Sequence, residues 1–142
     1  MIPKFRVWLP DLNQMLRVKA LVFEKDKTRC VCGYSFDFYL ENENATIMQS
    51  TGILDKNSQE IFKGDVLEIQ GIKMIVKFGS YKYLETSKNN GHILGILHDG
   101  LGFYVECINA ADPDNISPFE PETLKNSQII GNIYENKELL DA

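Results

Sequence analysis

Hydrophobic and polar residues alternate along most of this chain, and an alternation of period two is typical of β-strands. Residues 5–9 and 15–23 show it first, on either side of a turn at 10–13, so they predict an antiparallel hairpin. Residues 29–40 predict a third strand, because their even positions are apolar or aromatic and lie on one face. We expect that face to be buried; it carries Cys30, Cys32, Tyr34, Phe36, Phe38 and Leu40.

Two polar turns organise the middle of the chain. The first, Asp55-Lys56-Asn57-Ser58, uses side chains that hydrogen-bond their own backbone. The second, Lys63-Gly64-Asp65, places a glycine where the chain can take positive φ. The apolar pair Ile61 and Phe62 lies between them, and 66–69 follows as a strand. An apolar pair, a Gly-Asp turn and a strand are typical of the start of a small, strongly bent barrel of the SH3-like kind.

The second half of the chain continues in strands. A tight hairpin is predicted at 69–72, where Gly71 relieves positive φ. Two more turns are predicted at 87–91 and 98–100, with the apolar segment 93–97 between them. The residues after the first hairpin form an inward row: Ile72, Met74, Val76 and Phe78.

The C-terminal part predicts a strand at 103–108 and then a loop with three prolines at 109–121. A last strand is predicted at 127–134, followed by a short helix at 137–140 that Asn136 caps. Because nearly every periodic segment has period two, we predict a mainly β chain.

The central stretch also resembles a known family. Residues 50–65 read Ser-Thr-Gly-x-x-Asp-Lys-Asn-x-x-Glu-Ile-Phe-x-Gly-Asp, which is similar to the signature of the YopX family of phage and prophage proteins. Residues 4–8, 102–106 and 129–140 resemble further parts of that family in the same order. The resemblance implies a C-terminal SH3-like barrel, a β-rich N-terminal part and a phage-encoded cytosolic protein, and it implies no established activity. The chain departs from the usual family residue at three positions: Ser58, Lys63 and Lys137.

Together these observations predict a mainly β protein in which an N-terminal antiparallel β unit packs on a C-terminal SH3-like β-barrel with a short C-terminal helix. The polar loop Glu41-Asn42-Glu43-Asn44 is the best boundary between the two parts. We therefore expect an N-terminal β region at 1–46 and a barrel domain at 47–142.

Composition narrows the function classes. The chain has 142 residues and is 44% hydrophobic, so it can bury a core and is not a disordered tail. It contains no apolar run of about 18 residues, and no apolar core of a signal peptide follows the first charges. We expect a protein of the bacterial host cytoplasm that does not enter a membrane.

Charge is distributed unevenly around a net value of −5. Residues 4–29 carry seven basic side chains against three acidic ones, whereas 99–142 carry nine acidic against two basic. Such a split can steer one subunit onto another, so we expect a homo-oligomer. The alternative is two solvated surfaces that only keep the protein soluble.

Metal and cysteine chemistry are not favoured by the spacing. Cys30 and Cys32 are separated by a single residue, whereas structural zinc sites usually place two to four residues between paired cysteines. His92 and His98 flank loops and have no evident partner. Cys107 shares a predicted strand face with apolar residues and reads as core rather than as a nucleophile. We predict no metal, no cofactor and no catalytic residue.

Three carboxylates of the central stretch offer an enzymatic alternative. Asp55, Glu60 and Asp65 would serve a hydrolase if they converged on a metal or on a reacting group. Asp55 and Asp65 also have structural tasks in turns, which is the interpretation that we favour. No Gly-rich phosphate loop with a Lys-Ser/Thr ending is present.

Nucleic-acid binding is the main alternative function. We expect Arg6, Trp8, Arg17 and Lys19 on one solvent face of the N-terminal hairpin, where an indole among cations offers stacking and phosphate contacts. Otherwise Trp8 packs against the second domain or a neighbouring subunit. Because the whole chain is acidic, we favour a non-enzymatic binding or assembly module in a homo-oligomer. A host or phage protein is a further candidate partner.

Overall fold

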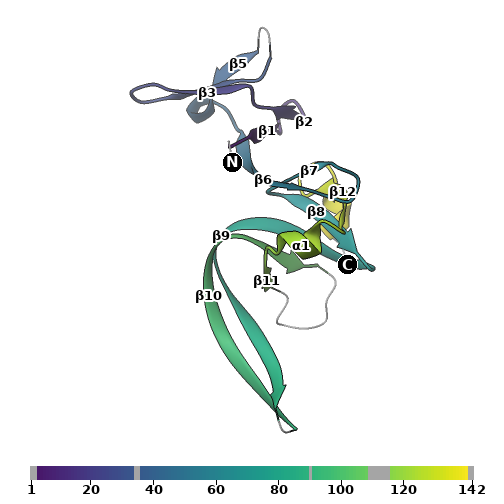
Figure 1. Cartoon of the computed structure of the whole chain (residues 1–142). Coiled ribbons are helices and arrows are strands. Elements are labelled where there is room, and N and C mark those ends of the chain that lie inside the picture. The colour runs from purple at the N-terminus through teal and green to yellow at the C-terminus, as the bar shows by residue number, and fades with distance from the viewer. Residues whose placement is uncertain (1–2, 34–35, 90, 109–115, 141–142) are drawn as a thin grey trace.

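The computed structural model describes residues 3–33, 36–89, 91–108 and 116–140. In these parts the chain is mainly β, as predicted, with three sheets, one short α-helix and two 3-10 turns (Figure 1). The N-terminal strands lie at one end of the molecule, a half-barrel sheet lies in the middle, and a long hairpin projects from the other end (Figure 1).

The first sheet joins the two predicted domains. Its order is β2 (Gln14–Arg17), β1 (Phe5–Leu9), β6 (Thr46–Leu54) and β7 (Glu60–Phe62), and its pairs are antiparallel. The predicted N-terminal hairpin is therefore confirmed. Since β1 also pairs with β6, the sheet spans the boundary expected near residue 46, and that boundary stays a prediction.

The second sheet corrects two strand predictions. It consists of β3 (Ala20–Phe23), β4 (Thr28–Val31) and β5 (Asp37–Tyr39), followed by the 3-10 turn η1 (Leu40–Asn42). The single strand predicted at 15–23 is broken, because the Val18 N–H donates to Phe5 in the first sheet and the Lys19 N–H donates to Val31 in the second. The strand predicted at 29–40 doubles back instead of continuing. Tyr34 and Ser35 lie outside the described residues.

The burial predicted for the third strand holds for its cysteines. Cys30 is fully buried with Val7 and Leu9 in a small core between the first two sheets. Cys32 and Phe38 are half-buried and pack against that core. Phe36, however, is exposed, because it follows the turn at which the chain reverses.

The third sheet forms the half-barrel. Its antiparallel order is β11 (Ile116–Pro118), β10 (His92–Cys107), β9 (Ile72–Asn89), β8 (Asp65–Ile69) and β12 (Gln128–Asn132). The predicted hairpin between β8 and β9 is confirmed, and positive φ angles of 51° at Gln70 and 80° at Gly71 give it the twist of a two-residue turn. The core comprises Ile61, Leu67, Met74, Val76, Val105 and, from helix α1 (Pro121–Leu124), Leu124.

The two longest strands extend beyond this sheet as a two-stranded hairpin. β8 pairs with β9 only as far as Ile75, and β11 pairs with β10 only between 104 and 106. We call residues 79–89 and 92–102 the arm; it curves away from the half-barrel (Figure 1). The predicted turn at 87–91 falls at its tip, whose Asn90 lies outside the described residues.

The turn predicted at 98–100 is wrong. These residues continue β10 and pair with 81–83 of β9. Gly100 is needed for space, because a Cβ placed there would lie 2.2 Å from Cζ of Tyr81. The glycine therefore lets the Tyr81 ring lie across the opposite strand.

The chain ends in a 3-10 helix, η2 (Lys137–Leu140), where the short helix was predicted. Asn136 does more than begin it: its Oδ1 accepts a hydrogen bond from the Asn132 N–H at 3.2 Å. Oδ1 of Asn132 in turn accepts from the N–H groups of Tyr134 and Glu135. This closed loop places the Tyr134 ring against the N-terminal sheet.

Candidate functional site

The groove between the N-terminal hairpin and the half-barrel is the first candidate site. It has a volume of about 710 Å³, and its lining includes Lys4, Arg6, Arg17, Glu60 and Asp65. Two of the three carboxylates named above and two of the four expected surface residues therefore meet in one place.

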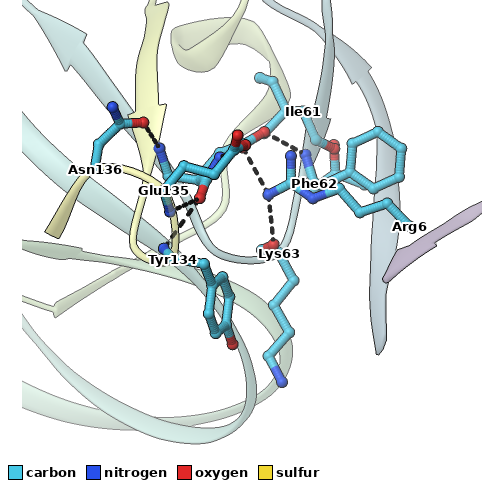
Figure 2. Close-up of polar contacts among 10 residues, drawn as sticks. Arg6, Ile61, Phe62, Lys63, Tyr134, Glu135 and Asn136 are labelled. Carbon is cyan, nitrogen blue, oxygen red and sulfur yellow. Dashed lines mark hydrogen bonds and ion pairs between the residues drawn. The ribbon is translucent and has the colours of Figure 1, made fainter. Parts of the chain in front are cut away.

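Arg6 and Asp65 form a buried ion pair in this groove. Figure 2 shows the Arg6 side chain beside Phe62 and Lys63. Nη2 of Arg6 lies 2.8 Å from Oδ1 of Asp65, and the two side chains are 11% and 2% exposed. The Phe62 N–H donates to Oδ2 of Asp65 at 2.7 Å, and Arg6 also donates to the Lys63 carbonyl. Burial raises the pKa of the Asp65 carboxyl, against the opposing effects of Arg6 and the Phe62 N–H. The pair ties β1 to the start of β8.

Glu60 receives two cations at the rim of the same groove. Its carboxylate lies 3.6 Å from Nζ of Lys4 and 3.1 Å from Nη1 of Arg17. The Arg17 guanidinium also lies over the Phe62 ring, 4.7 Å from its centroid, and Arg6 lies 4.8 Å from that centroid. The groove is thus lined by paired charges and by the Phe62 ring.

Asp55 lies in the first polar turn and does not line the groove. Its Oδ1 accepts from the N–H groups of Asn57 and Gln59, and its Oδ2 accepts from that of Ile129 at 2.9 Å. The carboxylate therefore holds its own turn and docks it on β12. Among the described residues no three metal-ligating side chains gather into a site. This geometry supports the structural interpretation of Asp55 and Asp65.

The four residues expected on one solvent face do not share it. Trp8 is 7% exposed and packs on Tyr134 with ring centroids 6.0 Å apart, and Arg6 is the buried partner of Asp65. Arg17 and Lys19 are exposed. The expected face is wrong for Arg6 and Trp8, because the side of β1 that carries both packs on the half-barrel. The alternative packing of Trp8 against the C-terminal part is confirmed, and nucleic-acid binding loses its stacking group.

Burial disfavours the thiolate form of all three cysteines. The Sγ atoms of Cys30 and Cys32 lie 3.7 Å apart and share a hydrogen bond, and the two residues form no disulfide. Burial raises the pKa of Cys30 to about 12 and also raises the pKa values of Cys32 and Cys107. His98 lies on the arm, where its ring stacks on Tyr83, and the side chain of His92 lies outside the described residues.

The arm is a second candidate site, which the sequence pattern did not indicate. Several of its large apolar side chains are exposed, and Leu97 and Leu101 reach 65% and 81%. The turn predicted at 98–100 separated these residues into a short segment and a loop, so their common strand went unnoticed. Their signal is the run of apolar residues between 93 and 103 with few charges.

Comparisons with known proteins agree with the central motif. The family model described as YopX protein matches residues 4–141. The chain belongs to the YopX family. The resemblance read from residues 50–65 is thereby confirmed. The crystal structure of protein EF1440 from Enterococcus faecalis is similar to this YopX-family chain, with 22% identity over 99% of both chains and a TM-score of 0.50.

That likeness to EF1440 concerns the fold alone. No protein of curated function matches this YopX-family chain. Within the described residues no helix has the length and apolar character needed to cross a membrane.

Proposed function

We propose that this YopX-family protein is a non-enzymatic assembly module, encoded by a phage or prophage, that forms homo-oligomers in the host cytoplasm. The single observation that carries this proposal is the arm, a two-stranded hairpin whose apolar side chains have no cover within the described residues. The groove does not compete with it, because its central charges are already paired.

Exposed apolar surface on the arm favours association. The large apolar side chains that are at least 37% exposed there are Leu84, Leu94, Ile96, Leu97 and Leu101. Burying apolar surface stabilises by about 25 cal/mol per Å², and contiguous exposed patches commonly mark interaction sites. A two-stranded hairpin is also marginally stable by itself in water. A partner that covers the arm would remove both costs.

The strand edges of the arm support the same function. No described strand pairs with the outer edge of β9 beyond Ile75 or with that of β10 before Tyr104. Such edges present unpaired N–H and C=O groups and are templates for contact with another chain. The uneven charge of the chain adds a long-range attraction between the basic N-terminal region of one copy and the acidic C-terminal region of another.

Light scattering after size exclusion tests this proposal with a pair of matched variants. We expect the wild-type mass to be a multiple of the chain mass, and we expect Leu97→Lys to lower it. Leu12→Lys is the control, because Leu12 is similarly exposed, at 52% against 65%, but lies in the N-terminal turn. A monomeric wild-type protein at micromolar concentration and about 0.1 M salt, where surface charges are screened beyond roughly 10 Å, would contradict the proposal.

A further inference from the structure

The two faces of the arm are built differently. Paired residues of an antiparallel ribbon share a face, so the register assigns each side chain to one of the two. One face carries rings that cover one another: Tyr81 stacks on Tyr104 at 4.8 Å, and Tyr83 stacks on His98 at 5.0 Å. Gly100 lies beneath the Tyr81 ring on this face. As far as His98 this aromatic face is therefore covered by its own side chains.

The opposite face continues the interior of the half-barrel. Val76 and Val105 are opposite each other in the register and buried in the core. One step outward Phe78 and Phe103 meet edge to face at 4.9 Å, and Phe78 is already 49% exposed. Beyond them, the residues on this same face continue along the arm as the cross-strand pairs 80/101, 82/99 and 84/97. We call this side of the arm, formed by residues 80, 82, 84, 97, 99 and 101, the aliphatic face.

Nothing among the described residues covers the aliphatic face. Leu101 is 81% exposed, and Leu84 and Leu97, which are opposite each other, are 37% and 65% exposed. Between them lies one ion pair, in which Nζ of Lys82 is 3.8 Å from Oδ1 of Asp99. That pair contributes little by itself, because both side chains are more than two-thirds exposed. The face thus resembles half of a core with one charged pair at its centre.

The pattern of this face is complementary to itself. Lys82 lies on β9 and Asp99 lies opposite it on β10, and Leu84 and Leu97 are placed in the same way one step outward. A second copy turned by a half-rotation about the long axis of the arm presents its Asp99 to Lys82 and its Leu97 to Leu84. A two-fold contact uses one patch twice, which is the commonest form of homo-oligomeric interface.

On this basis, and resting on the assembly function proposed above, we infer that the aliphatic faces of two arms stack on each other around a two-fold axis along the arms. The occupant of the face is a second copy of this chain. Each interface then contains a quartet of alternating charges, from Lys82 and Asp99 of both copies, between apolar rows. The aromatic faces are directed outward in this arrangement.

Charge reversal tests this inference through complementation. In Lys82→Asp the face carries two acids, and in Asp99→Lys it carries two bases, so stacking of two identical copies opposes like charges. We expect each single variant to dissociate at least about tenfold more readily than the wild type in sedimentation velocity. An equimolar mixture of the two variants restores the unlike contacts between the copies, although residues 82 and 99 within each copy stay alike in charge. We therefore expect the mixture to associate more strongly than either variant alone.

A control and three contrary outcomes complete the test. Lys125→Asp is the control. It reverses the charge of another exposed lysine, which pairs with Glu122 of α1 outside the arm, and it should leave association unchanged. A wild-type monomer would overturn the assembly function and this interface together. Variants that associate like the wild type would overturn the interface and leave the assembly function standing. Variants that dissociate but do not complement each other would overturn the two-fold stacking.

Discussion

At the residue scale, one buried ion pair fixes the N-terminal hairpin on the half-barrel. Arg6 and Asp65 are 59 positions apart in the sequence, yet they form an ion pair, and the Arg6 guanidinium lies over the Phe62 ring. Both side chains are largely buried, so each charge depends on the other for compensation. Asp65 of the Gly-Asp turn thus does two things: it accepts a hydrogen bond from the Phe62 N–H within its own turn, and it binds Arg6 of the N-terminal sheet.

Removal of Arg6 should therefore be costly. In Arg6→Ala the Asp65 carboxylate loses its counter-charge while still buried, and we expect the free energy of unfolding to fall by about 3–5 kcal/mol. Arg17→Ala is the control, since this arginine also contacts Phe62 and a carboxylate but its side chain is 66% exposed. We expect it to cost about 1 kcal/mol or less in urea titration. Equal losses of stability in the two variants would contradict this role of the buried Arg6–Asp65 pair.

Cys30 offers a prediction on pH. Its folded pKa of about 12 exceeds the ordinary value of 9.0, so the unfolded thiol ionises first as the pH rises. The contribution of this group to stability is complete below pH 9 and is lost as the pH rises toward 12. We expect the stability of the wild type to fall more steeply across this window than that of Cys30→Ala. Parallel pH profiles from chemical unfolding would contradict the assignment.

At the element scale, strand β10 of the arm continues through Gly100, although the sequence around this glycine predicts a turn. A His-Asp-Gly sequence normally favours a turn, but here the missing side chain accommodates Tyr81 on the neighbouring strand. This is a cross-strand relation between residues 19 positions apart, and no local pattern reveals it. The sequence therefore predicted strands on both sides of residues 98–100 and missed that they are one.

Gly100→Ala tests this role of the glycine. The added Cβ overlaps the Tyr81 ring, so we expect faster amide hydrogen exchange along the arm and a loss of stability that Tyr81→Ala partly relieves in the double variant. Gly33→Ala is the matched control, because a Cβ there meets nothing within 4 Å. Unchanged exchange in Gly100→Ala would contradict the packing described.

Most of the predicted turns were confirmed, although the one expected at 98–100 is a strand. The turn at 69–72, the Asp55 turn and the terminal helix all follow from residues within a few positions of each other. The strand breaks at Val18 and after Val31 were not predictable. They depend on which distant strand accepts a hydrogen bond from the next backbone N–H group, and no local pattern gives that. The same holds for the candidate site. The alternation in β1 predicts that residues 6 and 8 share a face, but it does not show that the half-barrel covers that face.

At the scale of the whole molecule, the Arg6–Asp65 pair and the Trp8–Tyr134 contact join the N-terminal sheet to the half-barrel. The arm takes part in none of these described contacts. Its aliphatic face is an extension of the core that ends in solvent. An assembly in which copies cover one another's arms would bury these exposed apolar side chains.

The most direct measurement of this account is amide hydrogen exchange of the wild-type protein at two concentrations, one on each side of the association midpoint. The account predicts that exchange within 80–86 and 95–101 slows on association, whereas exchange in the Arg6–Asp65 junction stays constant. Association that leaves the arm exchanging at the same rate, or a protein that remains monomeric throughout, would contradict it.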